Sequence, residues 1–175
     1  MAKIIYKEGC EGQNRIECIE GIEIDLLNGQ KALIYPKYAN ERLLEDEDIE
    51  KWSAEEVTEI EALKKLDSNH ATGALLRIGS PAAKHVSQFS SEGHGIFCLP
   101  TLLAALEIVD QKKDIDALAE QIEGADLLRD FSAIVWSCSR CSSVYGWFAS
   151  GLFGFAGLYY LFSRYAAVPL VLYKA

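Results

Sequence analysis

Two cysteines at the spacing Cys138-x-x-Cys141 are the most chemically suggestive residues in this chain of 175 residues. Together with His94 and Cys98 they could supply four ligands to Zn²⁺, which binds thiolates and imidazoles in tetrahedral sites. Cys138 and Cys141 could instead form a redox dithiol. Such a pair usually needs a helix N-terminus to lower the thiol pKa, and here it follows an expected strand. A zinc or redox role therefore stays an alternative to incidental thiols, and we expect no cofactor.

Other catalytic signatures are missing from the sequence. It contains no nucleophile elbow, no phosphate loop and no dinucleotide fingerprint. After Asp130 it contains no Asp, Glu, Asn or Gln, so the oxygen ligands of a calcium-dependent sugar site are lacking there. We therefore expect a protein that is not an enzyme.

The charges divide the chain into two unlike parts. Lys and Arg number 17 against 26 Asp and Glu, which gives a net charge of −9 and argues against nucleic acid or an anionic membrane as a partner. Ten acids lie between positions 41 and 61, whereas residues 131–175 carry only Arg140, Arg164 and Lys174 as charges. The second part also holds 12 of the 18 aromatic residues, so it should form core, an interface, or both.

The C-terminal aromatic residues are more numerous than one sheet face can easily bury. Tyr, Trp and Arg dominate the energetics of protein interfaces. We expect part of this set to bind a protein or surface ligand, or a second copy of the chain, while the rest packs in the core. The candidate binding residues are Trp147, Phe153, Phe155, Tyr159, Tyr160 and Arg164.

Residues 141–163 contain no charge over 23 positions, a length that could cross a bilayer. Four glycines and eight aromatic residues within that stretch are poor helix formers but suit strands and turns. The aromatic residues are also spread along the segment and not gathered at its ends. We expect antiparallel strands, and membrane attachment through this segment is the alternative.

The N-terminal part predicts a hairpin followed by a helix. Apolar and polar residues alternate over 16–27, and Asn28-Gly29 separates this run from the apolar run 31–35, which is typical of a two-residue turn. Ser53 and Glu56 form a capping box before a helix whose inward face should include Ile60 and Leu63.

Three further helices are expected from their N-terminal residues. Ser80-Pro81 and Pro100-Thr101 should each start one, since Pro is favoured in the first turn. Asp114 should cap a third, which Gly124 should end. The run 133–136 is expected to be a strand.

Several short motifs resemble, in order, the bacterial module named for the C-terminal domain of the Legionella collagen-like protein. The match covers about residues 93–173. Where that family has Arg, Glu and Arg, this chain has Cys98, Arg140 and Val168. The matching motifs are Gly95-Ile96-Phe97-Cys98-Leu99-Pro100-Thr101, Asp114-Ile115-Asp116-Ala117-Leu118, Val135-Trp136-Ser137-Cys138-Ser139, Tyr145-Gly146-Trp147-Phe148 and Tyr165-Ala166-Ala167-Val168-Pro169-Leu170-Val171.

This resemblance implies a C-type-lectin-like α+β fold, in which two helices flank an antiparallel sheet. Residues 93–175 would form that module, and residues 1–92 would add the hairpin and helix as an extension packed on the same domain. The resemblance also implies scaffold roles for Leu99, Pro100, Trp136 and Pro169. Such folds serve mainly in recognition, including phage receptor-binding proteins and proteins diversified by retroelements.

The five cysteines and the N-terminus bear on the compartment. The count is odd, and the first residues lack the apolar core of a secretory signal. We expect reduced thiols in a cytoplasmic protein, which could also be assembled into a larger particle.

Overall fold

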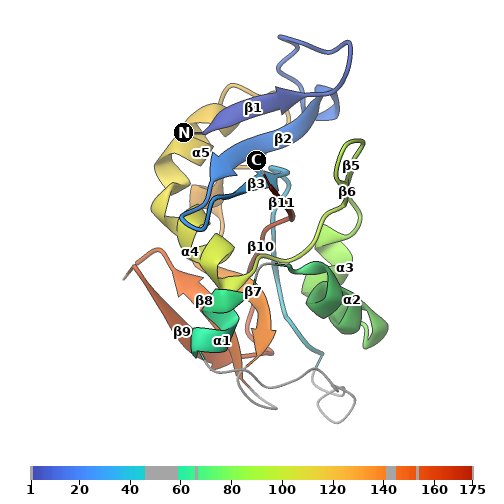
Figure 1. Cartoon of the computed structure of the whole chain (residues 1–175). Coiled ribbons are helices and arrows are strands. Elements are labelled where there is room, and N and C mark those ends of the chain that lie inside the picture. The colour runs from blue at the N-terminus through green and yellow to red at the C-terminus, as the bar shows by residue number, and fades with distance from the viewer. Residues whose placement is uncertain (1, 46–58, 66, 141–144, 153, 175) are drawn as a thin grey trace.

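The computed structural model describes residues 2–45, 59–65, 67–140, 145–152 and 154–174. Over these residues the chain forms five α-helices, two larger β-sheets and a small two-stranded sheet, so the expected mixed α+β class is confirmed. Figure 1 shows the two larger sheets one above the other, with α4 and α5 along one side of the molecule and α2 and α3 on the other.

A four-stranded antiparallel sheet contains the N-terminal hairpin. Its strands lie in the order β1 (Lys3–Tyr6), β2 (Ile19–Asp25), β3 (Gln30–Ile34) and β11 (Leu170–Lys174). The hairpin at Asn28-Gly29 is confirmed, but its turn is not the expected two-residue turn: Asp25 pairs with Lys31, so the register centres on Asn28, and of the two residues only Gly29 has a positive φ, of 80°. The sequence does not predict that the C-terminal strand β11 pairs with β3.

The five-stranded sheet holds most of the aromatic C-terminal part. Its strands lie in the order β4 (Ala39–Glu41), β10 (Tyr165–Ala167), β7 (Ile134–Arg140), β8 (Tyr145–Ser150) and β9 (Phe155–Tyr160). All neighbours are antiparallel except β10 and β7. The strands expected within 141–163 are therefore confirmed where the structure describes them. Among the described helices, none has the length and apolar character needed to cross a bilayer.

Both larger sheets combine strands from the two sides of the expected boundary at residues 92 and 93. β11 completes the sheet that contains the N-terminal hairpin, and β4 lies at the edge of the sheet built from β7 to β10. A third, two-stranded sheet, β5 (Ser90–Ser91) with β6 (Gly95–Ile96), spans the boundary itself. The two parts of the chain thus share their sheets.

Two of the predicted helix starts are confirmed by their caps. Ser80 precedes α3 (Pro81–Val86) and accepts the Ala83 amide at 3.2 Å. Thr101 precedes α4 (Leu102–Asp110) and accepts the Ala104 amide at 3.3 Å.

The prediction that Asp114 caps a helix is wrong. α5 (Lys112–Ala119) begins before Asp114, and Gln111 serves both as the last residue of α4 and as the N-cap of α5. The two helices therefore follow each other without a loop, and Asp114 lies in the first turn. Gly124 does not end the helix either: α5 ends at Ala119, and Gly124, with a φ of 83°, lies in the turns that follow.

The helical region before residue 90 differs from expectation. The capping box at Ser53 and Glu56 lies outside the described residues. α1 (Glu59–Lys64) buries Ala62, whereas Ile60, expected on the inward face, is 64% exposed. α2 (Asn69–Arg77) was not predicted, because His70, Thr72 and Gly73 hide its apolar periodicity.

The four expected scaffold residues are all buried: Leu99, Pro100, Trp136 and Pro169. The Trp136 indole donates to the Glu41 carbonyl at 2.9 Å and so joins the centre of the five-stranded sheet to its β4 edge. The Pro100 carbonyl accepts the Cys138 amide at 2.7 Å, and the Pro169 carbonyl accepts the Tyr35 amide at 3.0 Å.

Candidate functional site

The hairpin of β8 and β9 divides the expected binding residues between core and surface. Successive side chains of a strand point to opposite faces of its sheet. Trp147 of β8 points toward the helices and packs with Ala62 and Leu102, with only 7% of its surface exposed. It is therefore not part of the surface that a partner could touch.

β9 presents three large apolar side chains to solvent. Phe155 is 51% exposed, Leu158 40% and Tyr159 41%. The pairing of Phe155 with Ser150, of Leu158 with Trp147 and of Tyr159 with Gly146 places Phe155 and Tyr159 on one face of the sheet and Leu158 on the other. Sequence reasoning missed Leu158, and no signal in the sequence distinguishes it from Trp147, its buried neighbour on the same face. We call this strand with its exposed side chains the β9 edge.

Of the three other expected binding residues, the structure describes the side chain of Arg164 alone. Phe153 lies outside the described residues, and so does the side chain of Tyr160. The guanidinium of Arg164 is 3.5 Å from the Glu41 carboxylate. Since β4 and β9 are opposite edges of the sheet, this pairing directs Arg164 away from the β9 edge.

Tyr159 is held by aromatic neighbours on its own face. Its ring lies edge-on to Tyr165, with 5.0 Å between centroids, and 6.2 Å from Phe148. Burial, together with a hydrogen bond to Tyr159, raises the pKa of Tyr165 to about 12. The Tyr165 phenol is therefore neutral at ordinary pH, and its contact with Tyr159 orients the Tyr159 ring before any partner arrives.

Gly157 lies between Phe155 and Tyr159 on the same face. An added Cβ there would lie 2.6 Å from the tip of the Phe148 ring, so the ring occupies the space above the glycine. An aromatic ring from a neighbouring strand that covers a glycine in this way repairs the local loss of packing. Phe155, the Phe148 ring and Tyr159 thus form one apolar strip along the β9 edge.

An apolar groove lies beside the start of β9. Its volume is about 380 Å³, and it is lined by Leu103 and Leu106 of α4, by Leu27, which is 87% exposed, and by Gly154 of the β8–β9 turn. Glu107 and Asp110 give it an acidic rim. A chain that paired with β9 could place a side chain in this groove.

β9 borders only β8 among the described strands, and its sequence FAGLYY contains no charged residue. Proteins usually protect edge strands with charges, bulges, short length or covering elements, because an open edge can pair with another chain. Among the described residues, β9 has six residues, carries no charge and pairs with β8 without a bulge, and α4 contacts it over one face of the sheet.

The other three sheet edges each carry such a protection. β4 has only three residues, ends in Glu41 and packs against α3. β1 begins with Lys3 and has an irregular register between Ile5 and Tyr6. β11 is bridged by Cys98, whose amide donates to the Leu170 carbonyl at 2.8 Å. β9 is therefore the exception among the described edges of the two larger sheets.

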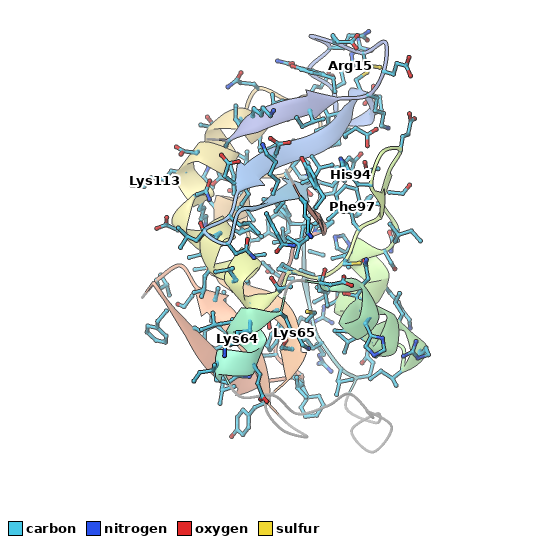
Figure 2. The ribbon with its side chains drawn as sticks, viewed as in Figure 1. Arg15, Lys64, Lys65, His94, Phe97 and Lys113 are labelled. Atoms are coloured by element: carbon cyan, nitrogen blue, oxygen red, sulfur yellow. The ribbon has the colours of Figure 1, made fainter. Side chains whose placement is uncertain are left out.

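The proposed zinc and redox ligands do not form a cluster where the structure describes them. Cys141 lies outside the described residues, and no group of three His, Cys, Asp or Glu suited to a metal occurs among the others. His94 is exposed, and its ring stacks on Tyr173 at 4.1 Å beside the four-stranded sheet (Figure 2). Its stacking partner thus comes from β11.

The Cys138 thiol is buried in the apolar cluster around Trp136. Burial raises its pKa to about 11, although Lys65, which follows α1 in front of the sheet (Figure 2), acts in the opposite direction. A thiol with this pKa is protonated near neutral pH, so it is a poor nucleophile and a poor metal ligand.

A second open cleft, of about 390 Å³, lies between α2 and the segment around β6. Cys98 and His94 both line it, as does Asn69, whose side-chain oxygen accepts the Cys98 thiol at 2.8 Å. Burial raises the pKa of Cys98. The cleft therefore contains a protonated thiol, and this does not favour nucleophilic chemistry.

The structure also brings Cys10 and Cys18 together, which the sequence did not predict. The two thiols form a hydrogen bond that raises the pKa of Cys10. The contact arises because the chain folds back between them, with the Lys7 amide donating to the Cys18 carbonyl at 3.0 Å. Their separation in sequence carries no recognisable motif.

Comparisons of the chain with family models, with curated proteins and with solved structures give no match. The functional interpretation therefore depends on the chemistry of the residues described above.

Proposed function

We propose that this chain is a non-enzymatic recognition module that binds a protein partner by pairing one of the partner's strands with β9. The observation that carries the proposal is the open β9 edge, an uncharged edge strand with exposed Phe155, Leu158 and Tyr159. When an extended segment joins a sheet edge, main-chain hydrogen bonds supply affinity and alternate side chains supply specificity.

The surroundings of β9 suit such a partner. The strip formed by Phe155, the Phe148 ring and Tyr159 offers apolar contact on one face of the sheet, and Leu158 offers it on the other. The groove beside Gly154 can hold an apolar side chain next to the acidic rim of Glu107 and Asp110. A partner segment should therefore be extended and apolar, with no acidic residue where it meets this rim.

We also propose a C-type-lectin-like architecture for residues 93–175. In support, each resembling motif lies on the type of element that the resemblance implies. The segment ending in Leu99-Pro100-Thr101 precedes α4, and residues 114–118 lie in α5. The motifs at 135–139 and 145–148 lie in β7 and β8, and the motif at 165–171 includes β10 and the start of β11.

A displayed library of random peptides tests the proposed function, with the protein immobilised at low density. Wild-type protein should select extended apolar peptides, and the double variant Phe155→Ser/Tyr159→Ser should lose them. Ile96→Ser is the matched control, because Ile96 is 63% exposed but lies in β6, outside the five-stranded sheet. The proposal fails if no peptide is selected, or if the double variant binds the selected peptides as well as wild type does.

A further inference from the structure

The sequence of β9 is self-complementary about its central glycine. Residues directly opposite each other in paired strands share a face of the sheet, so a second β9 can only pair in registers that match face to face. Phe155, Gly157 and Tyr159 lie on one face, and Ala156 and Leu158 lie on the other. An antiparallel pair centred on Gly157 satisfies this rule.

In this register the two strands complement each other residue by residue. Phe155 of each copy lies opposite Tyr159 of the other, so the pair contains two aromatic contacts on one face. On the other face, each Ala156 lies opposite the Leu158 of the second copy. Directly opposed aromatic and aliphatic pairs of this kind are the units that stabilise antiparallel sheets.

The centre of this pair is also well filled. Two glycines facing each other would normally leave a gap, but the Phe148 ring already covers Gly157 in each copy. It lies 6.2 Å from Tyr159 between ring centroids, so both copies contribute rings to one continuous strip. Centring the pair on Leu158 instead would place Gly157 opposite Tyr159 and lose both contacts between Phe155 and Tyr159.

Charge does not oppose this association. The chain carries a net charge of −9, yet its acids all precede residue 131. β9 itself is uncharged, and Arg164 is paired with Glu41. Glu107 and Asp110 lie beside the start of β9, so antiparallel pairing places these acids of the two copies at opposite ends of the pair and brings no like charges directly opposite each other.

We propose that the partner of the β9 edge is a second copy of this chain, joined by antiparallel pairing of the two β9 strands about a two-fold axis that passes between the two Gly157 residues. This inference rests on the proposed function, since it names the partner of the same edge. Closed two-fold dimers are the commonest symmetric assemblies, and this one joins two five-stranded sheets into a ten-stranded sheet.

Crosslinking between two single variants tests the register. Phe155→Cys and Tyr159→Cys are purified separately, and then each alone and the equal mixture are oxidised with a copper catalyst in air. In the mixture the two new thiols lie opposite each other, while the second Phe–Tyr contact stays intact. In either variant alone, the new thiols are about 13 Å apart along the strands, beyond the reach of a disulfide.

The expected result is a disulfide-linked dimer in the mixture, and none above the wild-type background in either variant alone. Wild type is the control for the native cysteines. Sedimentation velocity adds a second measurement, in which wild type should associate reversibly and the variant Phe155→Ser/Tyr159→Ser should have a dissociation constant higher by about tenfold or more. Equal crosslinking of one variant alone, or a wild-type monomer at every concentration, would overturn the inference.

The peptide library separates failure of this inference from failure of the proposed function. A monomer whose β9 edge still binds library peptides overturns the homodimer and leaves the proposed function standing. A monomer that binds no peptide overturns both.

Discussion

The two larger sheets both present strands to solvent, but with opposite chemistry. On the four-stranded sheet the Glu23 carboxylate accepts Lys31 at 2.5 Å and Lys3 at 3.2 Å, and also accepts the Tyr173 hydroxyl. Its polar groups therefore satisfy one another within the chain. The β9 edge of the five-stranded sheet instead exposes apolar side chains that its own chain covers only in part. A self-contained surface contributes stability, whereas an incompletely covered one is available for binding.

Substitution of Gly21, which lies in the four-stranded sheet, should lower the free energy of unfolding more than any other proposed substitution. Gly21 of β2 has a φ of 154°, and an added Cβ would lie 2.6 Å from the Ile34 carbonyl oxygen. Gly21→Ala should lower the free energy of unfolding by about 3 kcal/mol, because backbone atoms cannot move aside easily. Denaturant unfolding measures this. If Gly21→Ala lowered the free energy of unfolding less than Gly157→Ala does, the contrast between the two sheets would be contradicted.

Removal of the Glu23 charge should have the next largest effect. Burial alone would raise the pKa of Glu23, but hydrogen bonds from Lys31, Tyr173 and Lys3 outweigh it and hold the pKa below its ordinary value of 4.5. Glu23→Gln should lower the free energy of unfolding by about 2 kcal/mol at neutral pH, because two cations then lose their buried partner.

The effect of Glu23→Gln should also depend on pH. A lowered carboxyl pKa stabilises the folded state above the unfolded pKa, and this stabilisation is lost as the pH falls through the folded pKa. The difference between wild type and variant should thus be constant near neutrality and shrink below about pH 4.5. Urea unfolding at several pH values measures it, and a difference that grows on acidification would contradict the network.

Gly157→Ala should have a smaller effect than Gly21→Ala. The added Cβ would meet the tip of the Phe148 ring and not the backbone, and a side chain at a partly open edge can shift. The free energy of unfolding should fall by about 1 kcal/mol. The displaced ring should also weaken any association through the β9 edge, which sedimentation at matched concentrations would reveal.

The double variant Phe155→Ser/Tyr159→Ser should have the smallest effect on the stability of the monomer. Both side chains are about half exposed, at 51% and 41%, so their loss should change the free energy of unfolding by less than about 1 kcal/mol. A loss of several kcal/mol, measured at low concentration, would mean that these rings serve the fold and not a partner.

Local signals in the sequence predicted the parts of the fold that local chemistry decides. The hairpin at Asn28-Gly29 and the caps at Ser80 and Thr101 each depend on backbone groups within a few residues, so the residue types identify them. The sequence could not reveal the pairing of β11 with β3, because it joins residues far apart in the chain. The prediction for Asp114 was wrong because Asp is a favoured N-cap residue, but α5 has already begun at Lys112 and Asp114 lies within its first turn.

The sequence predicted the kind of site, an aromatic surface, but not which residues form it. Composition indicated an aromatic surface near residues 147–164, and β9 does expose Phe155 and Tyr159. Trp147 and Leu158 are neighbours on one face, yet α1 and α4 cover the first and leave the second partly open. Which helix covers which strand is a tertiary property that alternation along a strand cannot reveal.

Hydrogen exchange of the β9 amides tests most directly whether this strand accepts another. In the free monomer, the outward-facing amides of Phe155–Tyr160 should exchange quickly. They should become protected as protein concentration rises, or when a peptide selected from the library is added, while the amides of Ala39–Glu41 at the opposite edge should not change. Exchange over β9 that responds to neither treatment would contradict a role for this edge in binding.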